Sequence, residues 1–338
     1  MKYISRLSGL TLGFFLPLFA SAHVGYVVES EQFVTHTGGD ASFLLSAFAE
    51  PKNTIIMIVT LAVVVLLADT YTRSRTLKDM AKNIFARARN YNIFLPWLAR
   101  IAVGVALLGA GTAGVFISPI ANASPFIATL EIYLGFFILA GFLLVPSLAV
   151  ALCLYVIGLL QYPYLFGNLD FVGLILVLFS FGSGAPGVDD VLGVPFFNWF
   201  GLPKKWGLNA LRILSGTAFM FLALYEKLLN PHLTELVVNN YHLTNYVHVS
   251  PAMWVFSAGA IEFIIGLCLF IGFRIRVVSA IALLVITLTY FFFKEAVYSH
   301  VTLFGMLSIL FLTGGRHESP VLEKVKRVVR KVRRTKKA

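Results

Sequence analysis

Long apolar runs without a charged side chain constrain this chain more than any other feature of its sequence. Residues 55–67 are one such run, and they are apolar on every side rather than at alternate positions. A helix needs about 20 mostly apolar residues to cross a bilayer, whereas a membrane β-strand alternates apolar and polar side chains. These runs therefore predict membrane-spanning helices and argue against a β-barrel.

The composition of the whole chain supports the same class. Of its 338 residues, 58% are hydrophobic and only 13% are charged, and the mean hydropathy is +0.84. An ordinary soluble domain is about 25% charged, so a soluble protein is excluded. We predict an all-α, polytopic transmembrane bundle with about nine spans. They are expected near residues 54–70, 98–117, 128–146, 147–164, 168–184, 209–229, 252–273, 276–293 and 298–314.

The N-terminus has the pattern of a secretory signal. Two basic residues precede a short apolar stretch, residues 10–19, which is followed by the small residues Ala20-Ser21-Ala22. This order predicts a cleaved signal peptide over residues 1–22, with an uncleaved first helix as the alternative. In either case residues 23–53 are expected outside the cell.

The net charge of +11 is concentrated in two segments. Residues 73–100 hold seven Lys or Arg against one acid, and residues 316–338 hold ten against two. The positive-inside rule places both segments in the cytoplasm, which predicts a multi-pass cell-membrane protein with an extracytoplasmic mature N-terminus and a cytoplasmic C-terminus. The charge therefore indicates topology rather than a nucleic-acid partner.

The C-terminal segment also has apolar residues at helical spacing among its basic ones. We interpret residues 316–338 as a basic amphipathic tail that lies on the anionic lipids of the inner leaflet. A disordered basic tail is the alternative. The lipid bilayer itself is the first expected partner.

An internal repeat divides most of the chain. Arg100 lies nineteen residues before Pro119, and Arg212 lies nineteen before Pro231. The span that follows carries a Glu and two Gly in each copy, and the copies are 131 residues apart: Glu131, Gly135 and Gly141, then Glu262, Gly266 and Gly272. Four spans per copy is an even number, so the two modules would enter the membrane in the same direction.

The expected organisation follows from the signal, the lone helix and the repeat. Its parts are a signal peptide (1–22), an extracytoplasmic segment with a lone transmembrane helix and a cytoplasmic interfacial loop (23–97), a first four-helix module (98–208), a second four-helix module (209–315) and the tail (316–338).

Ionisable residues inside the spans are the candidate functional groups, since each is costly in hydrocarbon. A rise of about 1.5 Å per residue places Lys227, Glu262 and His300 in the outer third of the membrane. Tyr225 and Glu226 adjoin Lys227, so the second module is expected to hold a polar cluster open to the outside.

The sequence leaves two interpretations of this cluster open. Lys227 and Glu262 can form a structural ion pair that ties two helices together. Alternatively, Lys227 or His300 donates to the carbonyl of a polar head group such as a quinone ring, while Glu262 exchanges protons. Quinone is the possible cofactor on this second interpretation.

The first module lacks the equivalent charges. Ala113-Gly114-Val115 stand where the second module has Tyr225-Glu226-Lys227, and only Glu131 remains. We interpret this module as scaffold. Arg100 and Arg212 are interpreted as topology anchors at the inner interface.

No metal site is predicted. The histidines stand at no pair spacing typical of metal ligands, although cleavage after Ala22 would leave His23 as an N-terminal chelator. The two cysteines, Cys153 and Cys268, both lie within apolar spans and are interpreted as packing residues.

The second module resembles the DoxX-like family of four-helix membrane proteins. The residues that carry the resemblance are Arg212, then Tyr225 to Pro231 (YEKLLNP), then Glu262 with Gly266 and Gly272. Gly182-Ser183-Gly184 followed by Asp189 also looks like the glycine-rich close of that family. The likeness extends over about residues 100–335 as two modules and does not cover residues 23–97.

The resemblance implies a function linked to redox chemistry. Some members resemble the membrane subunit of thiosulfate–quinone oxidoreductase, and others are accessory partners of redox proteins. The leading hypothesis is thus an accessory or membrane-anchor subunit with a protein partner and no catalysis of its own. A small-solute or metal transporter with its site in the second module is the alternative.

Overall fold

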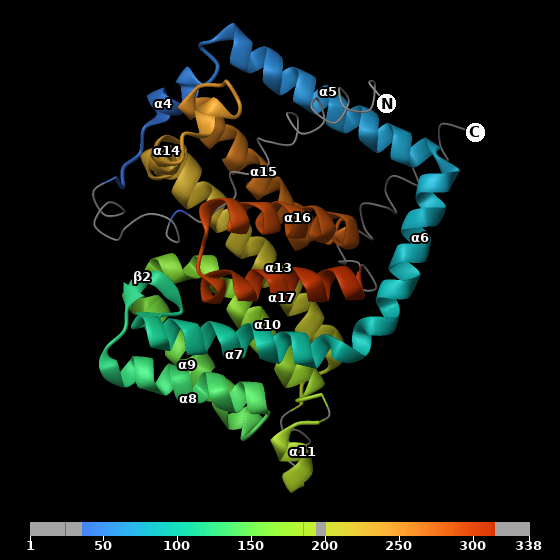
Figure 1. Ribbon diagram of the computed structural model, residues 1–338, viewed down its shortest axis with the longest axis vertical. Helices are drawn as coiled ribbons and strands as arrows, with labels where there is room; N and C mark the ends of the chain where they lie inside the picture. The colour runs from blue at the N-terminus through green and yellow to red at the C-terminus, as the bar shows by residue number, and fades with distance from the viewer. Residues whose placement is uncertain (1–23, 25–35, 185, 194–200, 315–338) are drawn as a thin grey trace, which may run out of the picture. The chain divides into compact units, whose positions relative to one another are not determined.

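The computed structural model describes Val24 and residues 36–184, 186–193 and 201–314 (Figure 1). The chain divides into two compact units. The first comprises Met1–Ala88, Phe221–Phe263 and Leu284–Ala296, and the second comprises Arg89–Met220, Ile264–Leu283 and Val297–Ala338. The predicted signal peptide and tail lie outside the described residues.

The described residues are almost entirely helical. The long helices are α5 (Pro51–Arg73), α6 (Arg75–Arg89), α7 (Leu95–Ala113), α8 (Pro125–Ala140), α9 (Leu144–Gln161), α10 (Leu169–Phe181), α13 (Lys204–Leu222), α15 (Pro251–Ile271), α16 (Ile275–Phe293) and α17 (Val297–Thr313). Shorter helices are α4 (Ala41–Ser46), α11 (Val188–Leu192), α14 (Pro231–Asn240), the 3₁₀ turns η2 (Asn90–Phe94), η3 (Pro163–Asn168) and η5 (Leu243–Asn245), and the π-helical η4 (Ala223–Leu229). One small antiparallel hairpin, β1 (Val115–Phe116) with β2 (Ser118–Asn122), follows α7.

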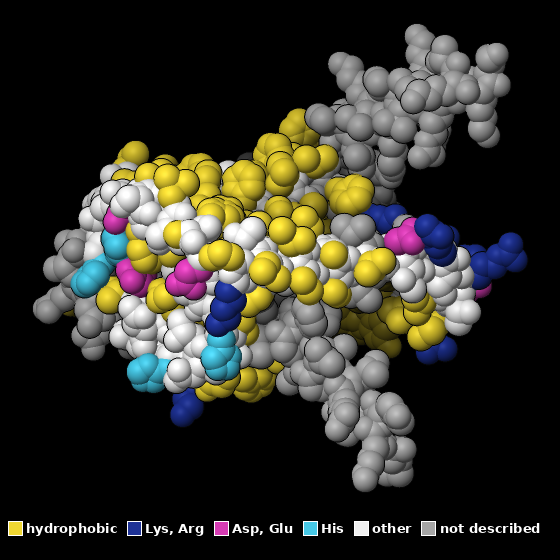
Figure 2. Space-filling model, turned by 90° about the horizontal axis from the view of Figure 1, so that it is seen from above, with side chains coloured by type: hydrophobic (Ala, Val, Ile, Leu, Met, Phe, Trp, Pro, Cys, Tyr) yellow, Lys and Arg dark blue, Asp and Glu magenta, His cyan; other side chains and the backbone are white. Residues whose placement is uncertain are grey.

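The predicted all-α polytopic architecture is confirmed. Within the described residues, seven helical segments are long and apolar enough to cross a membrane, and two shorter apolar helices accompany them. The seven are Pro51–Tyr71, Arg75–Ala113, Leu144–Gln161, Pro163–Phe181, Lys204–Leu229, Pro251–Ile271 and Ile275–Phe293; the two are Pro125–Ala140 and Val297–Thr313. Seven of these nine segments each overlap one predicted span, whereas Leu144–Gln161 and Pro163–Phe181 each overlap two neighbouring predicted spans. Hydrophobic side chains cover much of the face seen in Figure 2.

In the second unit, α7 packs against α8 on one side and α17 on another (Figure 1). Both α7 and α8 start with a proline in the first turn, where a missing N–H is harmless. Each also ends at a glycine in the left-handed conformation, Gly114 and Gly141, which an L side chain would strain. Local sequence therefore determines where each of these two antiparallel helices begins and ends.

In the first unit, α5 makes a polar contact near its start. Asn53 is fully buried and donates from Nδ2 to the carbonyl oxygen of Ala47 and to the hydroxyl of Ser250. Further along, side chains such as Ile55 and Leu61 are about 60% exposed. An apolar helix with this exposure is suited to contact with lipid.

Candidate functional site

The candidate site is built on a π-helical segment, Ala223–Leu229, that continues directly from α13. Its last turn is closed by a hydrogen bond from the Asn230 amide to the Tyr225 carbonyl, 3.0 Å long and spanning five residues. The side chain of Asn230 donates to the same carbonyl at 2.8 Å. Pro231 has no N–H with which to continue the pattern, so the wide turn ends there. Such π segments are rare and frequently occur at functional sites.

This segment directs two adjacent charged residues into the protein interior. Lys227 Nζ donates to Glu226 Oε2 at 3.1 Å and lies 2.7 Å from Glu262 Oε2 of α15. Exposure of the three side chains is 1% or less. Lys227, Glu226 and Glu262 therefore form one buried triad, which includes the Lys227–Glu262 pair expected from the sequence.

The backbone around the triad is closely packed. Gly259 of α15 faces Lys227, and a Cβ at Gly259 would lie 3.0 Å from Lys227 Cβ. The hydroxyl of Thr234, from α14, donates to the Glu226 carbonyl at 3.0 Å. These contacts fix the position of the ammonium between the two carboxylates.

The charges of the triad do not balance. One ammonium faces two carboxylates, so three ionised groups would leave a net charge of −1 in a fully buried site. A buried carboxylate is costly unless it is paired and hydrogen-bonded, and Glu226 and Glu262 each have further contacts besides Lys227. Carboxyl groups held beside an ammonium are the kind of groups that can take part in proton exchange.

Two other predicted site residues make contacts of their own. Tyr225 stacks on Phe221, with ring centroids 5.6 Å apart. His300 belongs to α17 in the second unit, where its Nδ1 lies 3.1 Å from the hydroxyl of Ser299. It also faces Asp170 of α10, and both are 1% exposed.

Glu131, which the proposed repeat aligns with Glu262, is fully buried, and no lysine among the described residues forms an ion pair with it. The backbone amide of Ile117 faces its carboxyl, yet neither carboxyl oxygen makes a hydrogen bond. Ile117 itself has a positive φ of 57°, which is strained for a β-branched residue. Within the described residues, Glu131 is therefore a buried carboxyl without an ion-pair partner.

Arg100 and Arg212 are both buried, at 1% and 4% exposure. Arg100 donates from Nε to the Ile138 carbonyl at 3.1 Å, from Nη1 to that of Ser183 at 3.0 Å, and from Nη2 to that of Leu139. Each nitrogen of its guanidinium thus has an acceptor.

Arg212 has a similar but smaller set of acceptors. Its Nη1 donates to the carbonyls of Leu269 and Phe270, at 3.1 and 2.6 Å, while Nε has no hydrogen-bond partner in the part of the chain that the structure describes. Leu269 and Phe270 stand 131 residues after the Arg100 acceptors Ile138 and Leu139. Arg100 and Arg212 therefore bind carbonyls near the carboxyl ends of α8 and α15.

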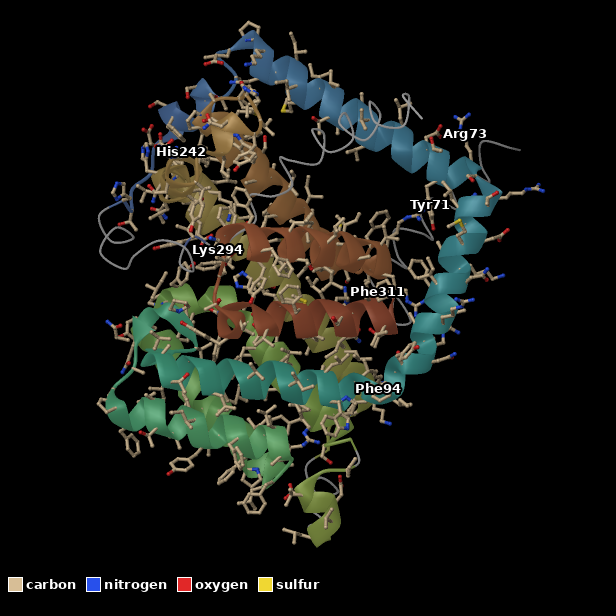
Figure 3. The ribbon with its side chains drawn as sticks, viewed as in Figure 1. Tyr71, Arg73, Phe94, His242, Lys294 and Phe311 are labelled. Carbon is tan, nitrogen blue, oxygen red and sulfur yellow. The ribbon has the colours of Figure 1, made fainter. Side chains whose placement is uncertain are left out.

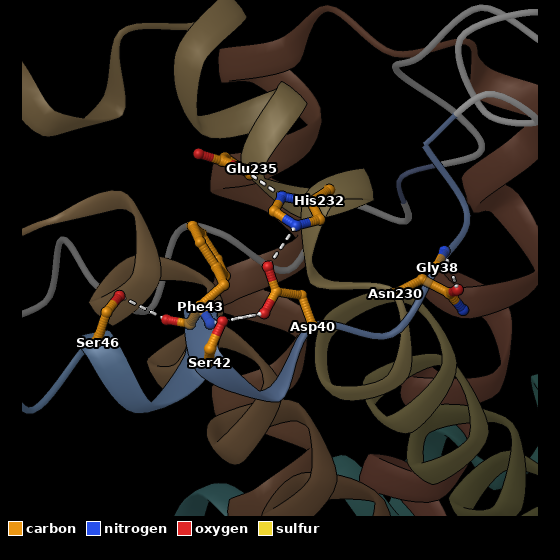
Figure 4. Close-up of polar contacts among 8 residues, drawn as sticks. All are labelled: Gly38, Asp40, Ser42, Phe43, Ser46, Asn230, His232 and Glu235. Carbon is orange, nitrogen blue, oxygen red and sulfur yellow. Dashed lines mark hydrogen bonds and ion pairs between the residues drawn. The ribbon is translucent and has the colours of Figure 1, made fainter.

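A second polar cluster, missed in the sequence, joins α14 to the segment before α4 (Figure 4). His232 Nδ1 lies 2.6 Å from Glu235 Oε2, and His232 Nε2 lies 3.1 Å from Asp40 Oδ2. Asp40 also caps α4 by accepting from the Phe43 amide at 2.9 Å. In the sequence, only the spacing of His232 and Glu235 on one helix face could have indicated this cluster, because Asp40 is 192 residues away.

Electrostatics hold this cluster together outside the membrane-spanning helices. Hydrogen bonding to Glu235, and then to Asp40, raises the pKa of His232 above its ordinary value. Hydrogen bonds from Ser42 and the Phe43 amide lower the pKa of Asp40 to about 2. Within the described residues, no group of three or more His, Cys, Asp or Glu side chains is arranged to hold a metal ion.

Comparison with known proteins identifies one family. Residues 207–295 match the family model described as DoxX, a stretch that contains Arg212, the π-helical segment and Glu262. No curated protein and no solved structure matches the chain. Over residues 207–295 the chain is therefore DoxX-like, and its apolar helices make it an integral membrane protein.

Proposed function

We propose that the chain is an accessory or membrane-anchor subunit of a quinone-linked redox system, similar to thiosulfate–quinone oxidoreductase. The observation that carries the proposal is the buried triad, in which Lys227 faces two carboxylates, 3.1 and 2.7 Å away. A partner subunit would supply two electrons to the quinone, and two protons must reach the resulting quinol. The triad is suited to hand on one proton at a time and to take up another.

The proposed topology and domain organisation support this role. Two parallel four-helix modules, 98–208 and 209–315, would follow a cleaved signal and a lone helix, with the mature N-terminus outside and the C-terminus in the cytoplasm. The matching acceptors of Arg100 and Arg212 favour such a duplication. Only the second module carries the triad, so the first would serve as scaffold.

Copurification is the first test. The full-length chain is extracted from its native membrane in a mild detergent, and bound protein and lipid-soluble ligands are identified by mass spectrometry. A stable redox partner with bound quinone is the expected result. A lone chain without quinone contradicts the proposal.

The second test separates proton exchange from a structural ion pair. Glu262→Gln leaves the Lys227–Glu226 pair neutral, and Glu131→Gln is the matched change at the equivalent position of α8. We expect Glu262→Gln to keep near-normal thermal stability and partner binding but to lose quinone-dependent turnover. Reduced stability with unchanged turnover would assign the triad a purely structural role.

A proton-coupled transporter of a small solute or metal ion is the second candidate. The same unbalanced carboxylate favours it, because carboxyl groups inside membranes commonly mark proton relays. Purified protein in liposomes would then move a labelled solute or ion in response to a pH gradient, and Glu262→Gln would stop it. The absence of transport under any gradient excludes this candidate.

A further inference from the structure

A cavity of about 470 Å³ lies in the second unit where several helices begin or end. Its lining comes from η2 and the first turn of α7, the end of α10, the first half of α13, the start of α16 and the end of α17. Two of its lining residues, Leu95 and Leu310, are next in sequence to Phe94 and Phe311, which are labelled in Figure 3. Helix ends lie near the head-group level of a bilayer.

The lining of this cavity combines positive charge with apolar walls. Lys204 and Arg212 supply two cationic groups, and none of the described residues that line the cavity is acidic. Asn92 and Asn209 add neutral polar groups, whereas most of the remaining lining is aliphatic or aromatic. A ligand that fits must carry both a negative charge and hydrocarbon.

Arg212 offers an unused donor to such a ligand. It is 4% exposed, lines the cavity and has no hydrogen-bond partner for Nε among the described residues. Its counterpart Arg100 has an acceptor for every guanidinium nitrogen. Buried polar groups are nearly always hydrogen-bonded in native proteins, so the unpaired donor points to a missing acceptor.

The two cations lie at different depths along α13. Lys204 is exposed at the first residue of the helix, where its ammonium lies 5.4 Å from the centroid of the Phe181 ring. Arg212 follows eight residues later, which corresponds to about 12 Å along a helix. Lys204 can therefore meet the phosphate of a head group from the water side, while Arg212 meets the same phosphate from the side of the acyl chains.

We propose that this cavity binds an anionic phospholipid, with its phosphate between Lys204 and Arg212 and an acyl chain along the apolar wall. Basic pockets between transmembrane helices bind anionic lipid head groups in this way. The volume lies within the range typical of small-molecule sites. The site is separate from the Lys227 triad and depends only on membrane insertion of the chain.

The experiment uses the full-length chain, stripped of lipid in detergent and titrated with phosphatidylglycerol or phosphatidylcholine. Binding is followed by native mass spectrometry and by the shift in thermal unfolding. The proposal expects selective retention and stabilisation by phosphatidylglycerol. Equal effects of the two lipids would overturn it.

Matched variants locate the site. Lys204→Gln removes a lining charge, whereas Lys205→Gln makes the same change at the exposed neighbour, which does not line the cavity. We expect Lys204→Gln to weaken phosphatidylglycerol binding roughly fivefold and Lys205→Gln to leave it unchanged. Equal weakening by both variants would indicate general surface charge and overturn the assignment.

Arg212→Gln is expected to weaken binding further, but it also removes bonds to Leu269 and Phe270, so Lys204→Gln remains the deciding variant.

A separate arm of the experiment replaces the lipid with inorganic phosphate or glycerol phosphate. Stabilisation by these soluble anions to the same extent would assign the cavity to a free phosphate compound instead of a lipid. Their failure to stabilise the protein, with phosphatidylglycerol active, supports the lipid.

Discussion

Gly216 of α13 and Gly266 of α15 meet backbone to backbone. A Cβ on Gly216 would lie 2.7 Å from the Gly266 carbonyl oxygen, and a Cβ on Gly266 would lie 2.8 Å from that of Gly216. Gly104 and Gly135 make the same contact between α7 and α8. Small residues allow membrane helices to approach this closely.

Gly266→Ala is therefore expected to destabilise the protein. The added methyl group must displace backbone rather than a flexible side chain, and overpacking of this kind costs roughly 1–3 kcal/mol. Thermal unfolding in detergent measures the loss. Gly38→Ala is the control, because no atom lies within 4 Å of a Cβ built there; equal effects of the two changes would contradict the close contact.

Lys227→Met is expected to lower stability more than either single Glu→Gln change in the triad. Without the ammonium, Glu226 and Glu262 must both be protonated or remain as unpaired buried charges, and breaking a buried pair costs roughly 3–5 kcal/mol. Glu226→Gln or Glu262→Gln leaves one neutral pair. Chemical denaturation at pH 7 compares the three variants, and a milder effect of Lys227→Met would argue against the triad.

The His232 cluster predicts a pH-dependent attachment of the segment around α4. The pKa of His232 is raised in the folded state, so its stabilisation is complete below the unfolded value of about 6.5 and is lost as pH rises through the folded pKa. The pKa of Asp40 is lowered to about 2, so its stabilisation is present above about 3.9 and is lost as pH falls toward 2.

The contact between Asp40 and His232 is thus strongest in mildly acidic solution. Hydrogen exchange of Ala41–Ser46 measures it, and protection is expected to fall as the pH is raised above neutrality. His232→Gln removes this dependence while keeping a polar side chain at the site. An unchanged pH profile in that variant would show that another group controls the segment.

Asp189 stabilises the turn between α8 and α9 by hydrogen bonds. Its Oδ1 and Oδ2 accept from the amides of Leu143 and Leu144 at 2.7 and 2.8 Å, and its own amide donates to Gly141. Asp189→Ala would leave two amides unpaired and is expected to cost about 1–3 kcal/mol. Asp189→Asn, which keeps one acceptor, should cost less in the same unfolding measurement.

The sequence was sufficient to predict the spans, because an apolar run of fixed length has few alternatives in a membrane. It was less accurate about helix ends. Residues 128–146 were expected as one span, whereas α8 is Pro125–Ala140, since Ser124 caps its start and Gly141 turns left-handed at its end. These local signals outweigh hydropathy at a boundary.

The candidate site was only partly predictable. Depth along a helix indicated Lys227, Glu262 and His300 as a group, but depth does not define which way a side chain faces. The structure joins Lys227 to Glu262 and Glu226, and it describes His300 beside Ser299 and Asp170. Contacts between residues far apart in the chain, such as Asp40 with His232, leave no periodic pattern to read.

The π-helical turn at Ala223–Leu229 makes the arrangement of the charged side chains depend on the number of residues in this segment. Successive side chains are about 100° apart around a regular helix and closer together around the wider turn, where Lys227 contacts both Glu226 and Glu262. One residue removed from this segment would restore regular winding and rotate everything up to Pro231. The charge cluster would then be lost even though each of its members was still encoded, so the count of residues here matters as much as their identity.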